Sequence, residues 1–241
     1  MNQRLHLAAS RFERLSRDAT EILCQPGWIH MGEPPIDWGA EIREQFRFGQ
    51  WLGGLRLWMA SLYRQRFPRY SAAELAELYG RCEFREFYFQ AGDRLEFDDN
   101  TFSMIVSEHF FEHLFLGDAI ALLRECHRIL KPGGVIRTCV PDADLRTYAA
   151  AEPPGYPSSR VPWTHHQKHL SRWSVYSLSE ALKIAGLEPV PVMCCTKDGQ
   201  FVNVLPTSET DGYAGCLEPE LISTTAYFRR LPSLVVDGIK R

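Results

Sequence analysis

The sequence predicts a single α/β domain over residues 1–241, a doubly wound and mostly parallel sheet with helices on both faces. A chain of 241 residues is close to the largest size that one hydrophobic core supports. Its 45% hydrophobic and 24% charged residues are typical of globular domains. A strand, a helix, a glycine-rich turn and another strand follow one another over residues 102–140. Because such a unit crosses over between parallel strands, at least part of the sheet is expected to be parallel.

The first two predicted strands lie near the N-terminus. Residues Arg4 to Ala8 form the first, because apolar and polar side chains alternate there. A polar helical stretch from Arg11 to Cys24 leads to the second strand, Gly27 to Met31. That strand is expected to end at the following Gly-Glu-Pro-Pro turn.

A helical insertion is predicted at about residues 41–82, between the second and third strands. The apolar residues of one helical face are Trp51, Leu52, Leu55, Met59 and Leu62. A capping box at Ser71 to Glu74 begins a further helix that ends at Gly80. Arginines and aromatic residues alternate in the insertion and could hold an anionic or planar molecule. An amphipathic helix with a solvated basic face is the more common meaning of this pattern.

The remaining elements lie between residues 86 and 239. Strands are predicted at Glu86–Ala91, Phe102–Val106, Val135–Val140, Val190–Cys195 and Ser233–Ile239. Asp118 is expected to cap a helix that stops at the turn Lys131–Gly134, and a capping box at Ser177–Glu180 is expected to open another that ends at Gly186. Prolines and glycine make about residues 151–168 a loop that could act as a lid.

Charge and cysteine content narrow the possible partners and compartment. The net charge is −3 and the charged residues are intermixed, so no nucleic-acid or membrane partner is expected. The seven cysteines are odd in number and lack C-x-x-C spacing, which is typical of reduced thiols in a cytoplasmic protein. The N-terminus lacks an apolar signal segment, and no uncharged apolar run approaches the ~20 residues of a membrane span. A small-molecule partner is expected, and a homodimer stays open.

Nearly the whole chain, apart from the helical insertion and the Pro-rich loop, resembles a known family. Residues 95–114 contain a polar turn, an apolar strand and the motif Glu-His-Phe-Phe-Glu-His, and Arg-Ile-Leu-Lys-Pro-Gly-Gly and Val-Pro-Asp follow at residues 128–134 and 140–142. This order resembles class I S-adenosylmethionine-dependent methyltransferases. The Pro-Gly-Trp-Ile segment at residues 26–29 is similar to a branch of small bacterial members. The resemblance implies a Rossmann-like, mostly parallel seven-stranded sheet, S-adenosyl-L-methionine as cofactor, and O- or N-methylation of a small molecule in biosynthesis.

The resemblance also implies where the cofactor would bind, although the first loop departs from the family. Ala8, Ala9 and Ser10 stand where the family has glycines that let the backbone approach the cofactor. An alanine forced into a left-handed conformation costs on the order of 1 kcal/mol, and its methyl group obstructs close approach. The cofactor affinity is therefore expected to be about tenfold weaker or worse.

Four further positions complete the implied cofactor site. Glu33 stands next to the place of the acid that holds the ribose hydroxyls. Gln90 lies at the end of the third predicted strand, about where an acid often meets the adenine amine in the family, and Asp93 is the alternative. Ser107 lies at the end of the fourth predicted strand.

Three histidines are the catalytic candidates. Methyl transfer requires an in-line arrangement and exclusion of water, and a neutral imidazole can remove a proton from the acceptor. His109 follows the fourth strand at the edge where open α/β sheets bind ligands, so it is the first candidate as base or substrate contact. His113 and His169 are the others, though each could equally hold a loop. Asp142 could contact the acceptor or orient a histidine. His165 and His169 have helical i, i+4 spacing, but no acidic third ligand is evident, so no metal site is expected.

Two other functions stay open. The missing glycines favour a cofactor-free protein that uses this fold for binding or as a scaffold. A second alternative keeps the cofactor but catalyses a non-methylating reaction, in which the sulfonium acts as an electrostatic element.

Overall fold

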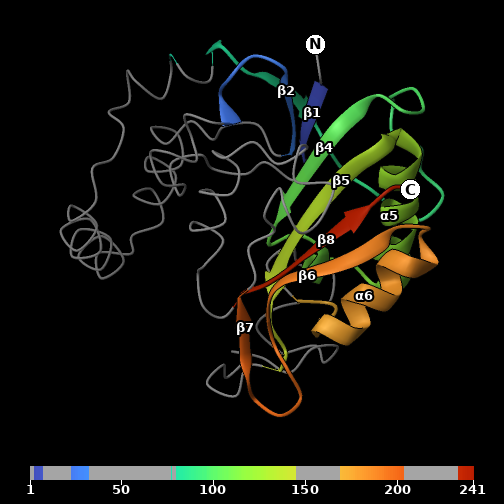
Figure 1. The fold of residues 1–241 in the computed structure, drawn as a ribbon. Helices are drawn as coiled ribbons and strands as arrows, with labels where there is room; N and C mark the ends of the chain where they lie inside the picture. The colour runs from blue at the N-terminus through green and yellow to red at the C-terminus, as the bar shows by residue number, and fades with distance from the viewer. Residues whose placement is uncertain (1–2, 8–22, 33–76, 78–79, 145–168, 204–232) are drawn as a thin grey trace, which may run out of the picture.

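A computed structural model describes residues 3–7, 23–32, 77, 80–144, 169–203 and 233–241 (Figure 1). Within these residues, one sheet of eight strands has the order β3-β2-β1-β4-β5-β8-β6-β7. The strands are β1 (Gln3–Leu7), β2 (Trp28–Gly32), β3 (Glu83–Glu86), β4 (Phe102–Glu108), β5 (Leu130–Pro141), β6 (Glu188–Cys195), β7 (Phe201–Asn203) and β8 (Ser233–Ile239). The described helices are η2 (Phe111–His113), α5 (Leu116–Ile129) and α6 (Val175–Ile184).

The strand directions confirm the predicted fold class. The neighbours in the order β3-β2-β1-β4-β5 are all parallel. β8 runs antiparallel to both β5 and β6, which therefore share one direction. The sheet has one strand more than the seven predicted, because the three residues of β7 pair antiparallel with the end of β6. A three-residue edge strand is too short for an alternating pattern to reveal it in the sequence.

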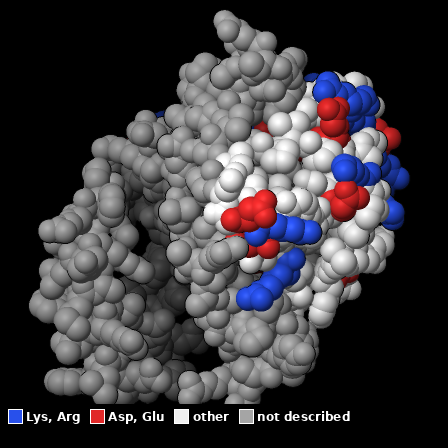
Figure 2. All heavy atoms as spheres, turned by 60° about the horizontal axis from the view of Figure 1, so that its bottom comes forward, with Lys and Arg blue, Asp and Glu red and all other residues white. Residues whose placement is uncertain are grey.

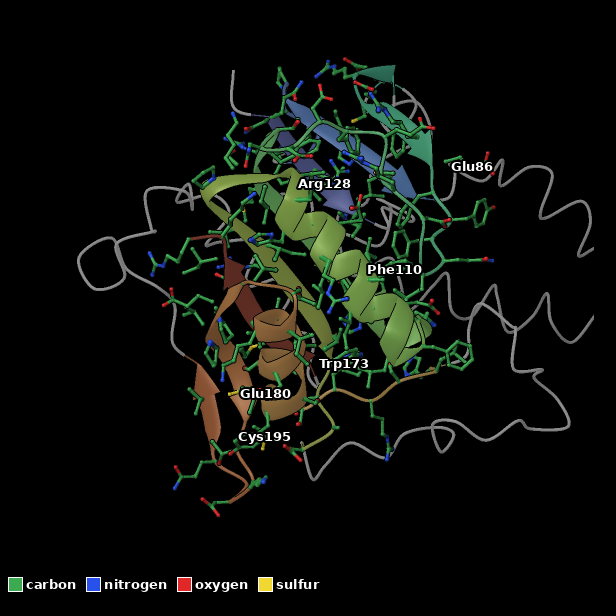
Figure 3. The ribbon with its side chains drawn as sticks, turned by 90° about the vertical axis from the view of Figure 1, so that its right-hand side faces the viewer. Glu86, Phe110, Arg128, Trp173, Glu180 and Cys195 are labelled. Atoms are coloured by element: carbon green, nitrogen blue, oxygen red, sulfur yellow. The ribbon has the colours of Figure 1, made fainter. Side chains whose placement is uncertain are left out.

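Helices α5 and α6 lie side by side on one face of the sheet (Figures 1 and 3). The buried face of α5 carries Ala119, Leu122, Leu123, Cys126 and Ile129. Side chains of β4 alternate between the two faces: Ile105 packs with the helices, whereas Met104 and Val106 belong to a second cluster on the opposite face. Both faces of the central strands are thus buried, as expected for parallel strands.

The third strand lies earlier than predicted, at Glu83–Glu86 instead of 86–91. The expected alternation is present, because Phe87 and Phe89 are buried and Tyr88 is exposed. The ladder nevertheless stops at Glu86, whose partner Gly32 is the last residue of β2. The length of a strand depends on its neighbour, which the local pattern does not contain.

The two predicted helix starts are shifted. Phe115, not Asp118, occupies the N-cap of α5, and Asp118 instead accepts a hydrogen bond of 2.9 Å from the backbone of Ala91. The capping box of α6 joins Ser174 and Ser177, three residues before the predicted Ser177–Glu180 pair. Both helices lie where the period of apolar residues predicts them, but the residues that cap them are not the predicted ones.

The Lys-Pro-Gly-Gly segment holds the C-terminal end of the chain. Gly133 has φ of +76°, and its backbone N–H donates to the Lys240 carbonyl at 2.7 Å. The Lys240 N–H donates to the Gly134 carbonyl at 3.0 Å. A β-carbon on Gly134 would lie 2.8 Å from the Lys131 carbonyl oxygen, so a larger residue does not fit. The segment therefore has a structural role, and β5 begins at Leu130 and not at Val135 as predicted.

Charges of both signs are mixed on the face shown in Figure 2. Ion pairs also join the described charges, and Arg128 bonds to Asp99 at 2.7 Å and to Glu125 at 2.8 Å. The described residues include no helix that is long and apolar enough to cross a membrane. The predicted stretch at residues 11–24, the insertion at about 41–82 and the loop at about 151–168 fall largely outside the described residues and stay predictions.

Candidate active site

The candidate site lies at the edge of the sheet where the parallel strands have their carboxyl ends. Leu7, the last residue of β1, is the partner of Ser107 in β4, and Ser107 is the partner of Thr138 in β5. The chain passes from β1 outwards to β2 and β3 and then returns to β4 on the other side of β1, so a topological switch point lies between β1 and β4. Figure 3 shows the two edges of the sheet at the two ends of α5. Trp173 lies near the edge of the candidate site, and Arg128 lies at the opposite edge.

His109 is fixed in a left-handed turn directly after β4. Its φ is +48°, an uncommon value for a residue other than glycine, and its backbone N–H donates to the Cys139 carbonyl at 2.8 Å. The ring Nδ1 lies 3.2 Å from Glu112 Oε1, and Nε2 lies 4.0 Å from Cys139 Sγ. The backbone and the ring are therefore both held, with the side chain 31% exposed.

Glu112, which is not among the residues predicted for the site, lies at its centre. Its side chain is only 3% exposed, and Oε1 lies 4.0 Å from His113 Nε2. Its backbone carbonyl accepts hydrogen bonds from Leu170 at 2.7 Å and Ser171 at 3.1 Å. Oε2 is buried and has no hydrogen-bond partner among the described residues. The H-x-x-E-H spacing of residues 109–113 is the signal that could have identified this glutamate.

The fold brings the three predicted catalytic histidines together. The rings of His113 and His169 meet edge to face, with 5.0 Å between centroids. Because the Glu112 carbonyl binds the backbone of the residues that follow His169, the segment after the Pro-rich loop is anchored against η2. His109 joins the group through its contact with Glu112.

The histidines differ in protonation. Burial lowers the pKa of His169, which favours the neutral form of this ring. Burial also lowers the pKa of His109, but its contacts with Cys139 and Glu112 outweigh that effect and raise the pKa to about 10. The raised pKa favours the protonated imidazole of His109, whose Nδ1 faces Glu112 Oε1 at 3.2 Å. This protonation fits the predicted role of substrate contact better than that of base.

Of the predicted cofactor contacts, Gln90, Asp93 and Ser107 are among the residues that the structure describes, and they lie at two places along the edge. Gln90 and Asp93 are exposed and form a tight turn, in which the Gln90 N–H donates to Asp93 Oδ2 at 2.6 Å and the Asp93 N–H donates to the Gln90 carbonyl at 3.0 Å. Gly92 within this turn has φ of +104°. Ser107 is fully buried, and its Oγ has no partner among the described residues. Ala8, Ala9, Ser10 and Glu33 lie outside the described residues.

Asp142 has a structural position that the sequence does not indicate. It is 1% exposed, its Oδ2 accepts a bond of 2.6 Å from the Cys195 N–H, and its Oδ1 accepts one of 3.0 Å from the Asp144 N–H. Burial raises its pKa. This carboxylate ties the end of β5 to the end of β6.

Comparison with known proteins gives one match to a family model and several to solved structures. Residues 63–138, which include β3, β4 and α5, match the model described as a methyltransferase domain. An S-adenosylmethionine-dependent methyltransferase from Mesorhizobium loti is 14% identical, with 98% of this chain and 90% of that chain covered and a TM-score of 0.45. No curated protein sequence matches significantly.

Two further solved structures are similar to the same extent. The YcgJ protein of Bacillus subtilis is 14% identical, with coverage of 100% of this chain and 92% of that chain and a TM-score of 0.43. The 1,6-didemethyltoxoflavin-N1-methyltransferase of Burkholderia thailandensis is 15% identical, with coverage of 100% and 72% and a TM-score of 0.47. The strand order with the reversed β8 is that of a Rossmann-like, mostly parallel α/β sheet, and residues 63–138 of this chain match the methyltransferase-domain model.

Proposed function

We propose that this protein transfers a methyl group from S-adenosylmethionine to an oxygen or nitrogen atom of a small-molecule acceptor. One observation carries the proposal: a chain with methyltransferase-domain sequence has polar residues gathered at the switch-point edge of its sheet. Ligands of open α/β sheets bind at this edge. When bound, the cofactor supplies a methyl group activated on a sulfonium.

The described residues fit a nucleoside cofactor at the ends of β1 to β4. Ser107 has a buried hydroxyl without a partner among the described residues, which a polar ligand could satisfy. We assign Gln90 and Asp93 to the adenine, in an exposed turn that follows β3. We assign the ribose to Glu33 and the methionine portion to Ala8, Ala9 and Ser10, which follow β2 and β1 in the sequence.

On the acceptor side we assign His109, His113 and His169. His109 is held through its backbone and its ring, so it can present a fixed polar group to the acceptor. His113 and His169 add two imidazoles whose rings touch each other. Groups held in this way contribute to catalysis by orienting the nucleophile in line with the methyl group, and a mispositioned nucleophile costs a large part of the rate.

A cofactor-free binding protein is the second candidate, because Ala8 and Ala9 replace the expected glycines. The test that separates the candidates is product mass. The purified full-length protein is incubated with S-adenosylmethionine and a panel of small alcohols, phenols and amines. A product heavier by one methyl group, with S-adenosylhomocysteine released, supports transfer. A product that is an isomer of its substrate supports the non-methylating alternative, and binding of neither cofactor form supports the scaffold.

A further inference from the structure

Three metal-ligating side chains converge beside the sheet edge. Glu112, His113 and His169 each offer one ligand atom, and these atoms all lie within 4.8 Å of one another. Glu112 and His113 belong to η2, whereas His169 lies 56 positions further along the chain than His113. The sequence does not reveal this set, because Glu112 and His113 are more than fifty positions away from His169 and only the fold brings them together.

The donor set selects a class of ion. Two imidazoles and one carboxylate suit Zn²⁺ and related divalent transition ions, whereas Mg²⁺ and Ca²⁺ prefer oxygen ligands. A tetrahedral ion with ligands at about 2.1 Å holds them about 3.4 Å apart. The ligand atoms lie up to 4.8 Å apart, so binding an ion would draw them closer by rotation of these half-buried side chains.

A second observation points to a cation independently of the spacing. The Glu112 side chain is only 3% exposed. Its Oε2 nevertheless has no hydrogen-bond partner among the described residues. A buried carboxylate oxygen without a partner is costly, and a metal ion at this place would remove that cost. The other oxygen, Oε1, contacts His109 Nδ1 at 3.2 Å, the kind of outer contact that orients a metal ligand.

The backbone already holds the two halves of the set together. The Leu170 and Ser171 N–H groups donate to the Glu112 carbonyl, and the Ser171 hydroxyl donates to the Phe111 carbonyl at 3.1 Å. These bonds fix the residue next to His169 against the residues that carry the other two ligands. The ordering of the ligands is therefore part of folding, which favours tight binding.

We propose that Glu112, His113 and His169 bind one divalent transition-metal ion of the zinc class. Three protein ligands leave the fourth position of a tetrahedral ion to water or to an oxygen of a bound small molecule. The site uses only these side chains and does not depend on methyl transfer.

The test is metal binding by the full-length protein in the absence of S-adenosylmethionine. The protein is stripped with a chelator and titrated with Zn²⁺ in a calorimeter. Wild-type protein should bind one ion, and His113→Ala, His169→Ala and Glu112→Gln should each weaken binding by more than about tenfold. His127→Ala is the matched control, since His127 lies in the last turn of α5, outside the set, and should bind as the wild type does.

Co²⁺ separates this site from the cysteines, which could also bind zinc. A histidine and carboxylate site gives visible bands without the intense near-ultraviolet band of a thiolate ligand. Circular dichroism confirms folding, and His169→Gln replaces His169→Ala if the latter does not fold. Wild-type protein that binds no ion, binding that survives both histidine substitutions, or a thiolate band would each overturn the proposal. None of these results bears on methyl transfer, which is measured separately.

Discussion

The buried pair Arg137–Asp237 gives the most quantitative prediction. The two residues face each other across β5 and β8, with Nε to Oδ1 at 2.8 Å and a second bond to Oδ2 at 2.6 Å. Their side chains are 1% and 0% exposed. Arg137→Met leaves the Asp237 carboxylate buried without this partner, and breaking such a pair costs about 3–5 kcal/mol. A domain of this kind has a total stability of about 5–15 kcal/mol, so the loss is large.

The assay is urea unfolding of the wild type, Arg137→Met and the double variant Arg137→Met/Asp237→Leu. The double variant should recover most of the lost free energy of unfolding, because no unpaired charge remains. Lys183→Met is the control, since its pair with Glu180 is exposed and should change stability by less than about 1 kcal/mol. An exposed ion pair contributes about 1 kcal/mol at most. The reasoning is refuted if the free energy of unfolding of Arg137→Met lies within about 1 kcal/mol of the wild-type value, or if the double variant is no more stable than the single one.

Three further predictions concern pH, packing and cofactor affinity. Burial, with a smaller effect of His30, lowers the pKa of His6 from 6.5 to about 3. Between pH 6.5 and about 3, the unfolded chain binds a proton at His6 that the folded chain does not. The free energy of unfolding should therefore fall by roughly 1 kcal/mol for each pH unit as the pH drops. Urea unfolding at a series of pH values should show a smaller slope for His6→Asn than for the wild type. Gly238→Ala places a β-carbon 2.7 Å from Leu182 Cδ2 and 3.1 Å from Ile136 Cγ2, and should lower the free energy of unfolding by about 1–3 kcal/mol. Gly117→Ala is the control: its β-carbon meets no atom within 4 Å, so this variant should be as stable as the wild type or more stable. Ala8→Gly with Ser10→Gly should tighten the binding of S-adenosylhomocysteine in a calorimeter by about tenfold.

Each of these has a result that contradicts it. An unchanged pH slope in His6→Asn would mean that another group carries the acid sensitivity. Equal stability of the Gly238→Ala and Gly117→Ala variants would show that the neighbours of Gly238 yield without cost. If the two glycine replacements leave the affinity for S-adenosylhomocysteine unchanged, the residues after β1 do not limit cofactor binding.

The sequence predicts the elements of this fold better than their ends. The period of apolar residues predicts α5 correctly, because that pattern is a property of the helix itself. The end of β3 at Glu86 depends on where its neighbour β2 ends, which is set by pairing across the sheet. The cap of α5 at Phe115 is likewise hidden, since Asp118 is used by the distant backbone of Ala91.

The candidate site is predictable only in part for the same reason. His109 can be placed because its position after β4 follows from local sequence and from the general rule for open sheets. The role of Glu112 depends on Leu170, Ser171 and His169, which only the folded chain brings to it. Asp142 was expected near the acceptor, but the backbone of Cys195 uses its carboxylate.

Calorimetric titration of the purified full-length protein with S-adenosylhomocysteine and with S-adenosylmethionine tests the central claim most directly. The proposed function predicts saturable binding of one molecule per chain, with an affinity that falls when Asp93 is replaced by alanine. The absence of any binding heat with both compounds, at the highest soluble protein concentration, would contradict it.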